Sequence, residues 1–524
     1  MKRNEQLSNL NTTTEWDAII IGGGASGLGA AVDASTRGYK TLLLEAHDFA
    51  KATSSRATKL LHGGVRYLAQ GDIALVKEAL RERGLLERNA SHLAKKQVFV
   101  IPNYKWIDGP FYTIGLKFYD MLSKKLSLGK SRHINKQKTL EMLPTVEPKS
   151  LCGGVIYYDG QFDDSRLAVN LAQTAVENGG TVINYMKVIG LLKNDAGQIC
   201  GVKAKDLING NEYEIKGKAV FNATGVFTNE ILNMNDPNHK KTVVPSQGIH
   251  LVLDKSFLPG DNALMIPKTS DGRVLFAVPW HNRLVVGTTD VLVEKPSLEP
   301  RALEKEIEFV LATAGQYLTK KPTRKDVLSI FAGQRPLAAP DKDGGSTKEV
   351  SRSHKILVSD SGLMSIIGGK WTTFRQMAED FIDKAIELGK LPSKECKTVN
   401  LSIHGNVPAS QVDRSKHNYI YGSDIPAIQK LEQENPDLAQ KIHPNHNYTK
   451  AEIVWAVKEE MAEKVEDILA RRVRLLFIDA RAAIDCAEEV ARIMAKELGH
   501  DADWVAKETE EFKTLAKGYL LVNY

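Results

Sequence analysis

The chain has 524 residues, 42% of them hydrophobic and 26% charged, and a formal net charge of +6. This length accommodates two or three domains. So small a charge gives no indication of nucleic-acid binding, although it suits an anionic substrate or an acidic membrane surface.

The sequence also limits where the chain can reside. The first 14 residues are polar, and no run of eighteen or more apolar residues occurs, so we expect neither a secretory signal nor a membrane-spanning helix. The four cysteines are far apart and form no CxxC pair, so we expect no metal site and no disulfide scaffold. A cytoplasmic protein, able to lie on a membrane surface, fits best.

Residues 16–45 predict a strand, a turn, a helix and a second strand. Apolar residues 18–21 and 41–44 read as buried strands, and residues 28–37 are typical of a helix. Gly22, Gly24 and Gly27 follow the first strand at GxGxxG spacing, and Glu45 ends the second. This arrangement predicts a dinucleotide site, in which the spacing alone does not separate NAD from FAD.

Each of these residue types has a physical role in such a site. Gly22 lets the chain turn tightly, Gly24 lets the backbone approach a pyrophosphate, and Gly27 lets the helix pack closely on the strand. The helix N-terminus attracts the anion, and Glu45 can accept hydrogen bonds from ribose hydroxyls.

The chain then continues with a predicted helix over 71–93 and a strand over 97–101. Residues 102–130 mix aromatic and basic side chains, which indicates either an amphipathic membrane-surface segment or, slightly more favoured from this segment alone, a helix packed on its own domain. Aspartates at 159–164 predict a turn and an N-capped helix over 167–177, in preference to a cation site.

Later segments predict more of the same site. Strands are expected at 181–185 and 187–192, and a strand over 218–222 runs into Ala223-Thr224-Gly225, where small residues suit a cofactor lying on the backbone. Residues 245–254, 271–280 and 282–290 predict antiparallel strands. Residues 366–372 repeat the pattern of a strand, two glycines and a helix start.

The last part of the chain has helical spacing over 426–442, 449–462, 465–473 and 479–498. It carries a dense basic cluster, Arg471, Arg472 and Arg474. Ion pairs with the many nearby glutamates are the slightly preferred interpretation of that cluster, ahead of a lipid or partner contact.

Several segments, in order from Asp17 to about Ala480, resemble the FAD-dependent glycerol-3-phosphate dehydrogenase family. They are TSSRATKLLHGGVRYL (53–68), DDSRL (163–167), DGRVLFAVPW (271–280), VVGTTD (285–290), GQRPL (333–337) and IIGGKWTTFR (366–375). Trp371 departs from the family, which commonly has leucine there.

The resemblance implies an α/β fold: an FAD-binding Rossmann-like domain of the glutathione-reductase type, an antiparallel-sheet substrate domain and a C-terminal all-α domain. The expected ranges are 15–110, 150–240 and 335–390 for the FAD-binding domain, 111–149 and 241–334 for the substrate or cap domain, and 395–524 for the helical domain.

The resemblance further implies oxidation of glycerol 3-phosphate to dihydroxyacetone phosphate, with hydride transfer to FAD. No histidine or cysteine context specifically indicates a covalent flavin, so a non-covalent FAD is expected. The expected substrate-binding residues are Arg66, Tyr67, His250, Arg335 and Lys370, and the expected catalytic residues are His62, His250, Arg335 and Lys370. Either histidine can be the base, because neutral imidazole accepts a proton near pH 7. The expected FAD contacts are Gly22, Gly24, Gly27, Glu45, Ser54, Ser55, Lys59, Leu60, Val188, Ala223, Gly225 and Gly369.

A membrane quinone is the expected electron acceptor, because no room is seen for the mid-chain insertion of the family's oxygen-using branch. A peripheral place on the inner face of the cell membrane follows, with residues 106–130 as its first candidate surface and with Lys124 and Lys125 expected to assist vesicle binding. A homodimer is compatible with the sequence. The alternatives are a glycerol-3-phosphate oxidase, an amino-acid oxidase of the same flavin fold, and a non-catalytic flavin-binding protein.

Overall fold

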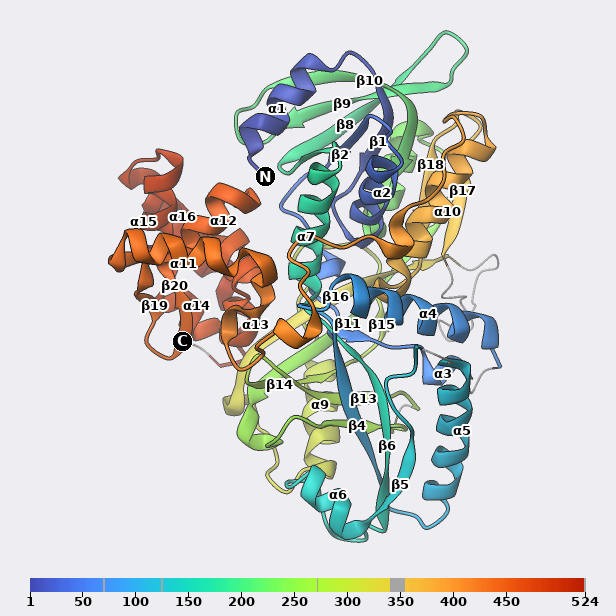
Figure 1. Cartoon of the computed structure of the whole chain (residues 1–524), viewed down its shortest axis with the longest axis vertical. Helices are drawn as coiled ribbons and strands as arrows, with labels where there is room; N and C mark the ends of the chain where they lie inside the picture. The colour runs from blue at the N-terminus through green and yellow to red at the C-terminus, as the bar shows by residue number, and fades with distance from the viewer. Residues whose placement is uncertain (69–70, 124–125, 271, 340–353, 523–524) are drawn as a thin grey trace.

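The structure is a computed structural model that describes residues 1–68, 71–123, 126–270, 272–339 and 354–522, apart from the side chains of residues 66 and 67. It has three parts (Figure 1): a sheet with covering layers at the top, a second sheet below it, and a group of helices at the left.

A largely parallel sheet with strand order β17-β18-β10-β1-β2-β7 forms the upper part. The strands from β18 to β7 are parallel, and β17 runs antiparallel to β18. β1 is central because its apolar run buries both faces, as an inner parallel strand requires. The bounds are β1 Trp16–Ile21, β2 Thr41–Leu44, β7 Thr181–Ile183, β10 Glu212–Asn222, β17 Lys355–Val358 and β18 Met364–Ile367.

The two faces of this sheet have different covers. Helices α2, α7 and α10 pack together on one face, and the antiparallel pair β8 and β9, which continues β10, packs with α1 on the other. This three-layer arrangement leaves the carboxyl ends of the parallel strands open for a ligand. The bounds are α1 Arg3–Thr12, α2 Ala25–Thr36, α7 Asp164–Glu177, α10 Phe374–Glu387, β8 Met186–Lys193 and β9 Ile199–Asp206.

The second sheet is mostly antiparallel, with order β15-β11-β14-β13-β12-β4-β6-β3; β16 also pairs with β11, and β5 with β6. Helix α9 covers one side through Ile307 and Val310. The strands are β3 Leu60–Leu61, β4 Lys95–Asn103, β5 Arg132–Asn135, β6 Gly153–Gln161, β11 Val243–Asp254, β12 Ala263–Ile266, β13 Leu275–Trp280, β14 Arg283–Gly287, β15 Val291–Leu292 and β16 Val327–Ala338. The helices of this region and its borders are α3 Val65–Leu68, α4 Ile73–Asn89, α5 Asp108–Ser123, α6 Lys136–Met142 and α9 Glu304–Tyr317. Helix α8, Thr228–Asn235, packs on β8 beside the first sheet.

Helices make up most of the third part (Figure 1, orange to red). Its core includes Trp280 and Phe331 from the second sheet, so the two parts share buried apolar surface. The bounds are α11 Ile425–Glu434, β19 Lys441–His443, β20 His446–Thr449, α12 Lys450–Glu460, a π-helix Asp467–Arg472, α13 Leu475–Ile478, α14 Ala480–Asp485, α15 Ala487–Leu498 and α16 Ala502–Lys517.

The predicted fold class agrees with this architecture, but some elements differ. Strands β4 and β6 pair in the second sheet, although residues 95–103 and 153–161 lie in ranges expected for the FAD-binding domain. Hydrophobic patterns identify strands without revealing their partners, so the domain limits stay a prediction. The helix predicted over 426–442 ends at Glu434, since Pro436 opens a separate short turn. Helices α1 and α16 were not predicted.

Candidate active site

A cleft of about 1480 Å³ lies at the carboxyl ends of the parallel strands. Its walls come from the glycine-rich turn, the loop after β2, the turn after β10 and the turn after β18. The cleft brings together nine of the predicted site residues: Gly22, Gly24, Glu45, Ser54, Val188, Ala223, Gly225, Gly369 and Lys370.

The glycine-rich turn has the geometry that its spacing predicts. Gly22 has φ +109°, and a Cβ there would lie 2.7 Å from the carbonyl oxygen of Ala223. A Cβ on Gly27 would lie 1.8 Å from the carbonyl oxygen of Gly22, so only glycine allows α2 to approach β1 this closely. Gly24 lines the cleft directly before α2, whose N-terminal N–H groups can therefore face an anion.

Glu45 lies at the end of β2 and is fixed by the turn opposite. Its Oε2 accepts from the backbone N–H of Gly23 at 2.6 Å, and its Oε1 from that of His47 at 2.8 Å. Burial raises the pKa of Glu45, whereas these two hydrogen bonds act to lower it. A carboxylate held in this way keeps lone pairs that can accept from ribose hydroxyls.

These features fit a dinucleotide of the size of FAD. The glycine turn places no Cβ where a pyrophosphate would lie, and Glu45 stands at the end of β2, where such folds bind the ribose. The small residues Ala223 and Gly225 also line the cleft. FAD would be held by these residues together with Gly369. A Cβ added at Gly369 would lie 2.4 Å from the sulfur of Met377, so a larger residue there would require Met377 to move.

Of the FAD contacts predicted in segment 54–60, only Ser54 lines the cofactor cleft. Ser54 Oγ accepts from the N–H of Ala25 at 2.9 Å, and Leu60 lies beyond the cleft, in the wall of the next cavity. Ser55 is buried. The Lys59 side chain is fully buried and turned into the core, where its Nζ donates to Asp164 Oδ2 at 2.7 Å and to the carbonyl oxygen of Ser55 at 2.7 Å. Burial lowers the pKa of Lys59 to about 7, against the attraction of Asp164.

A second cavity, of about 1060 Å³, adjoins the cleft and shares Thr53, Gly368, Gly369, Lys370 and Trp371 with it. It brings together all four predicted catalytic residues: His62, His250, Arg335 and Lys370. A third cavity, of about 980 Å³, continues from it past His62 and Arg335 and is also lined by Arg273 and Asp290. The second cavity therefore adjoins both the cofactor cleft and the third cavity, since it shares lining residues with each.

His250 is buried in β11 between aromatic and polar neighbours. Its ring stacks on Phe331 at 4.9 Å, and its Nε2 lies 2.9 Å from Thr58 Oγ1. Burial lowers the pKa of His250 well below its ordinary value, and the positive charges of Lys59 and Arg335 lower it further. His250 is therefore a neutral imidazole near pH 7, and the same shift makes it a weaker base than an ordinary histidine.

Arg335 lies in β16, opposite Ser246 of β11. Its Nη2 donates to Thr288 Oγ1 and to the carbonyl oxygen of Thr289, both at 3.2 Å, and its Nη1 lies 3.6 Å from Asp290 Oδ1. These contacts hold the guanidinium at the cavity wall. The side chains of Arg66 and Tyr67 lie outside the described residues, and their backbone belongs to α3.

Sequence reasoning missed three residues that shape the site. Thr58 contacts His250, Asp164 joins Lys59 to the N–H of Ala57 at 3.0 Å, and Trp371 Nε1 donates to the carbonyl oxygen of Ser54 at 2.9 Å. Thr58 lies inside segment 53–68, which carries the family resemblance, and this is the only feature of the sequence that points to it. The sequence predicts a capped helix at these aspartates, and Asp163 does cap α7 by accepting from the N–H of Arg166 at 2.9 Å. The contact of Asp164 with Lys59 does not follow from that pattern.

Comparisons with known proteins agree with this geometry. Residues 17–375 match the family described as FAD dependent oxidoreductase, and residues 362–505 match the C-terminal domain of alpha-glycerophosphate oxidase. The probable mitochondrial glycerol-3-phosphate dehydrogenase of Caenorhabditis elegans is 38% identical over 98% of this chain and 74% of its own. The mitochondrial glycerol-3-phosphate dehydrogenase SDP6 of Arabidopsis thaliana is 38% identical over 95% of this chain and 85% of its own.

Solved structures extend the comparison to the fold. The glycerol-3-phosphate dehydrogenase from Bacillus halodurans, complexed with FAD, superposes with a TM-score of 0.80 at 28% identity, over 99% of this chain and 97% of that one. The L-alpha-glycerophosphate oxidase from Mycoplasma pneumoniae shares the fold alone, with a TM-score of 0.57 at 17% identity over 74% of this chain and 98% of that one. The predicted fold and the predicted cofactor, FAD, are thereby confirmed, and the chain belongs to the FAD-dependent glycerol-3-phosphate dehydrogenase family.

Proposed function

We propose that this protein oxidises sn-glycerol 3-phosphate to dihydroxyacetone phosphate and passes the electrons to a membrane quinone. The observation that carries the proposal is the convergence of His62, His250, Arg335 and Lys370 on one cavity that opens onto the cofactor cleft. The near full-length likeness to glycerol-3-phosphate dehydrogenases supports the choice of substrate.

Each of these residues has a role that follows from its chemistry. Arg335 and Lys370 hold the dianionic phosphate, for which the fork of the guanidinium is well suited. A ring nitrogen of His62 or of His250 takes the proton of the C2 hydroxyl. The chemistry that FAD supplies when bound is acceptance of the hydride from C2. Arginine is a poor base because its pKa stays above about 12, so Arg335 acts through its charge.

Anaerobic reduction of the flavin tests the substrate. The purified protein with its FAD is mixed with sn-glycerol 3-phosphate, and we expect its visible flavin absorbance to bleach. A quinone analogue added next should restore the absorbance quickly and oxygen only slowly. Rapid recovery in oxygen with peroxide formed would identify an oxidase, and the absence of bleaching in FAD-loaded protein would contradict the substrate assignment.

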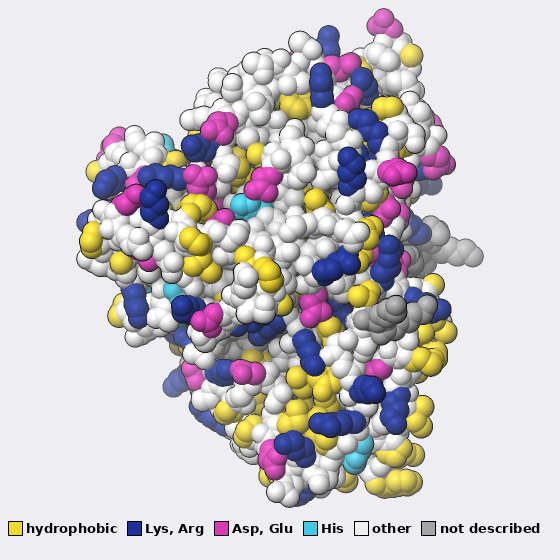
Figure 2. Space-filling model, viewed as in Figure 1, with side chains coloured by type: hydrophobic (Ala, Val, Ile, Leu, Met, Phe, Trp, Pro, Cys, Tyr) yellow, Lys and Arg dark blue, Asp and Glu magenta, His cyan; other side chains and the backbone are white. Residues whose placement is uncertain are grey.

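A membrane quinone as acceptor requires a surface that reaches the lipid, and α5 offers one. Trp106, Phe111 and Ile114 are 81%, 70% and 72% exposed, and Ile107, Phe118 and Met121 are also exposed. Figure 2 shows hydrophobic side chains along the lower right edge of the molecule, where α5 lies in Figure 1. Within the described residues, no helix is long and apolar enough to cross a bilayer. We therefore propose that α5 binds the membrane interface from one side.

The amino-acid oxidase alternative is less well supported. Solved glycine oxidases share the fold over about three quarters of this chain, for example the Bacillus cereus enzyme at 19% identity and a TM-score of 0.52. The C-terminal part of this chain instead matches a domain described for alpha-glycerophosphate oxidase. Turnover of glycine or of other amino acids by the purified protein would reverse this preference.

A further inference from the structure

The loop from Ala46 to Arg56, between β2 and β3, has two faces with different partners. Ala46, His47 and residues 50–54 line the cofactor cleft. Asp48 and Ser55 of the same loop are buried and contact the C-terminal helical part of the chain. Apart from one short turn the loop has no regular structure, so its shape depends on what it contacts.

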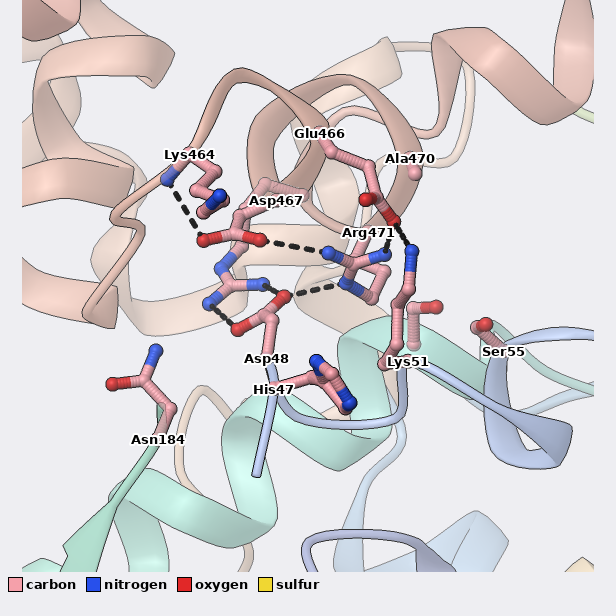
Figure 3. A network of polar contacts seen from close by, with 12 residues as sticks. His47, Asp48, Lys51, Ser55, Asn184, Lys464, Glu466, Asp467, Ala470 and Arg471 are labelled. Carbon is pink, nitrogen blue, oxygen red and sulfur yellow. Dashed lines mark hydrogen bonds and ion pairs between the residues drawn. The ribbon is translucent and has the colours of Figure 1, made fainter. Parts of the chain in front are cut away.

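Asp48 is the centre of these contacts (Figure 3). Its Oδ2 accepts from Arg471 Nε at 2.5 Å and from Arg472 Nη1 at 2.8 Å, and its Oδ1 accepts from Arg472 Nη2 at 3.0 Å. All three side chains are almost completely buried. Burial alone would raise the pKa of Asp48, but Arg472 and Arg471 hold it below its usual value, so the carboxylate is charged.

Glu466 and Asp467 complete the network from the C-terminal side. Arg471 Nη1 donates to Glu466 Oε1 at 2.6 Å, and its Nη2 to Asp467 Oδ1 at 2.7 Å. Glu466 also pairs with Lys51, whose stem lines the cofactor cleft. Glu466 and Asp467 therefore hold Nη1 and Nη2 of Arg471, and this orients its Nε toward Asp48.

A third arginine holds the far end of the loop. Arg474 Nη2 donates to the carbonyl oxygen of Ser55 and to Asp164 Oδ1, both at 3.0 Å. Arg471 and Arg472 belong to a π-helix, a rare conformation that often occurs at functional sites. This helix points neighbouring arginines at a single carboxylate.

We propose that Arg471, Arg472 and Glu466 are positioning residues for the cofactor: through Asp48 and Lys51 they hold the loop in its FAD-binding shape. The affinity for FAD then depends on the C-terminal helical part, although none of the described residues of that part lines the wall of the cleft. Because coupling between sites is reciprocal, bound FAD must in turn stabilise the contact between the loop and this part. The proposal rests on FAD binding in the cleft and is independent of the substrate.

Glu466→Gln tests the proposal, because it removes the negative charge of Glu466 without changing the shape of the side chain. The Glu466 side chain is 18% exposed. The matched control is Glu497→Gln, whose carboxylate is 17% exposed and pairs with Lys458 within the helical part, away from the loop. After removal of the flavin, the Kd for FAD is measured by the quenching of FAD fluorescence. We expect about a 10-fold rise for Glu466→Gln and no change for Glu497→Gln.

A second measurement uses the unaltered chain and does not depend on the folding of a variant. Hydrogen exchange of backbone amides is compared with and without FAD. We expect exchange over residues 460–474 to slow when FAD binds, and exchange in α15 and α16 to stay the same. An unchanged Kd in folded Glu466→Gln, equal effects of the two variants, or exchange over 460–474 that does not respond to FAD would each overturn the proposal.

Discussion

At the scale of single residues, charge and burial give different roles to Arg335 and His250, which both line the second cavity. Arg335 keeps a permanent charge, fixed by Thr288, Thr289 and Asp290. His250 is kept neutral by burial and by cationic neighbours. A fixed cation beside a neutral imidazole suits a substrate that carries a phosphate at one end and loses a proton at the other.

Arg335→Gln should weaken substrate binding while leaving the flavin bound. Loss of a charged hydrogen-bond partner costs about 1.5–3 kcal/mol, so we expect KM for glycerol 3-phosphate to rise by about 10- to 100-fold. Steady-state kinetics with a quinone analogue would measure this change. Arg324→Gln is the control, because Arg324 is an exposed arginine that pairs with Glu304 and lines none of the three cavities. Equal KM values for Arg335→Gln and the unaltered protein would exclude a role in binding.

The histidine that takes the proton can be identified by comparing His250→Asn with His62→Asn. The variant that loses the base should lower kcat by about 100- to 10,000-fold and still bind FAD. Because the folded pKa of His250 lies well below its ordinary value, its imidazole stays uncharged where an ordinary histidine would titrate. If His250 is the base, kcat should show no acidic limb near pH 6.5, whereas kcat/KM also reports the second ionisation of the substrate phosphate, at about pH 6. A limb in kcat near pH 6.5, absent from His250→Asn, would contradict the depressed pKa.

Local sequence patterns anticipated the cofactor side of the site better than its interior. Gly22, Gly27 and Glu45 follow from short-range geometry, which the spacing encodes directly. The burial of Lys59 depends on Asp164, more than a hundred positions away, and such a pairing leaves no local signal. Thr58 beside His250 is likewise a meeting of a loop with a strand far away in the sequence.

At the scale of elements, the two sides of α5 differ in a way that bears on the two interpretations that the sequence left as alternatives. Its inner side buries Leu116 and Tyr119 against its own domain, and its outer side exposes Phe111 and Ile114. The packed-helix interpretation therefore holds for one side only. Lys124 and Lys125, predicted to assist vesicle binding, lie outside the described residues.

Replacing Phe111 and Ile114 together by aspartate should release the protein from membranes. Each large apolar side chain gives about 1.5–3 kcal/mol when buried, so we expect binding to phosphatidylglycerol-containing vesicles to fall by at least about 100-fold in a flotation assay. The control places the same two charges at Leu207 and Ile208, which are 42% and 43% exposed in the turn after β9. Undiminished flotation of the α5 variant would remove α5 as the membrane surface.

At the scale of the whole molecule, the predicted three-part division holds in outline, whereas the assignment of strands to parts needed the structure. The basic cluster near residue 472 was interpreted as ion pairs, and the arginines do form them. Their partners include Asp48 and Asp164 as well as the nearby Glu466 and Glu460. Sequence proximity suggested the near partners; the distant ones depend on how the helical part docks.

The order of strands in the first sheet has a consequence for synthesis of the chain. β1 pairs with β10, and β10 in turn pairs with β18, which ends at Ile367. At about 5–20 residues per second, a ribosome needs roughly 7–30 s to extend the chain from the end of β10 at Asn222 to the end of β18. Until then β10 has an open edge, exposed to pairing with other chains. A nascent chain of this protein therefore carries an unpaired inner strand edge for a substantial part of its translation.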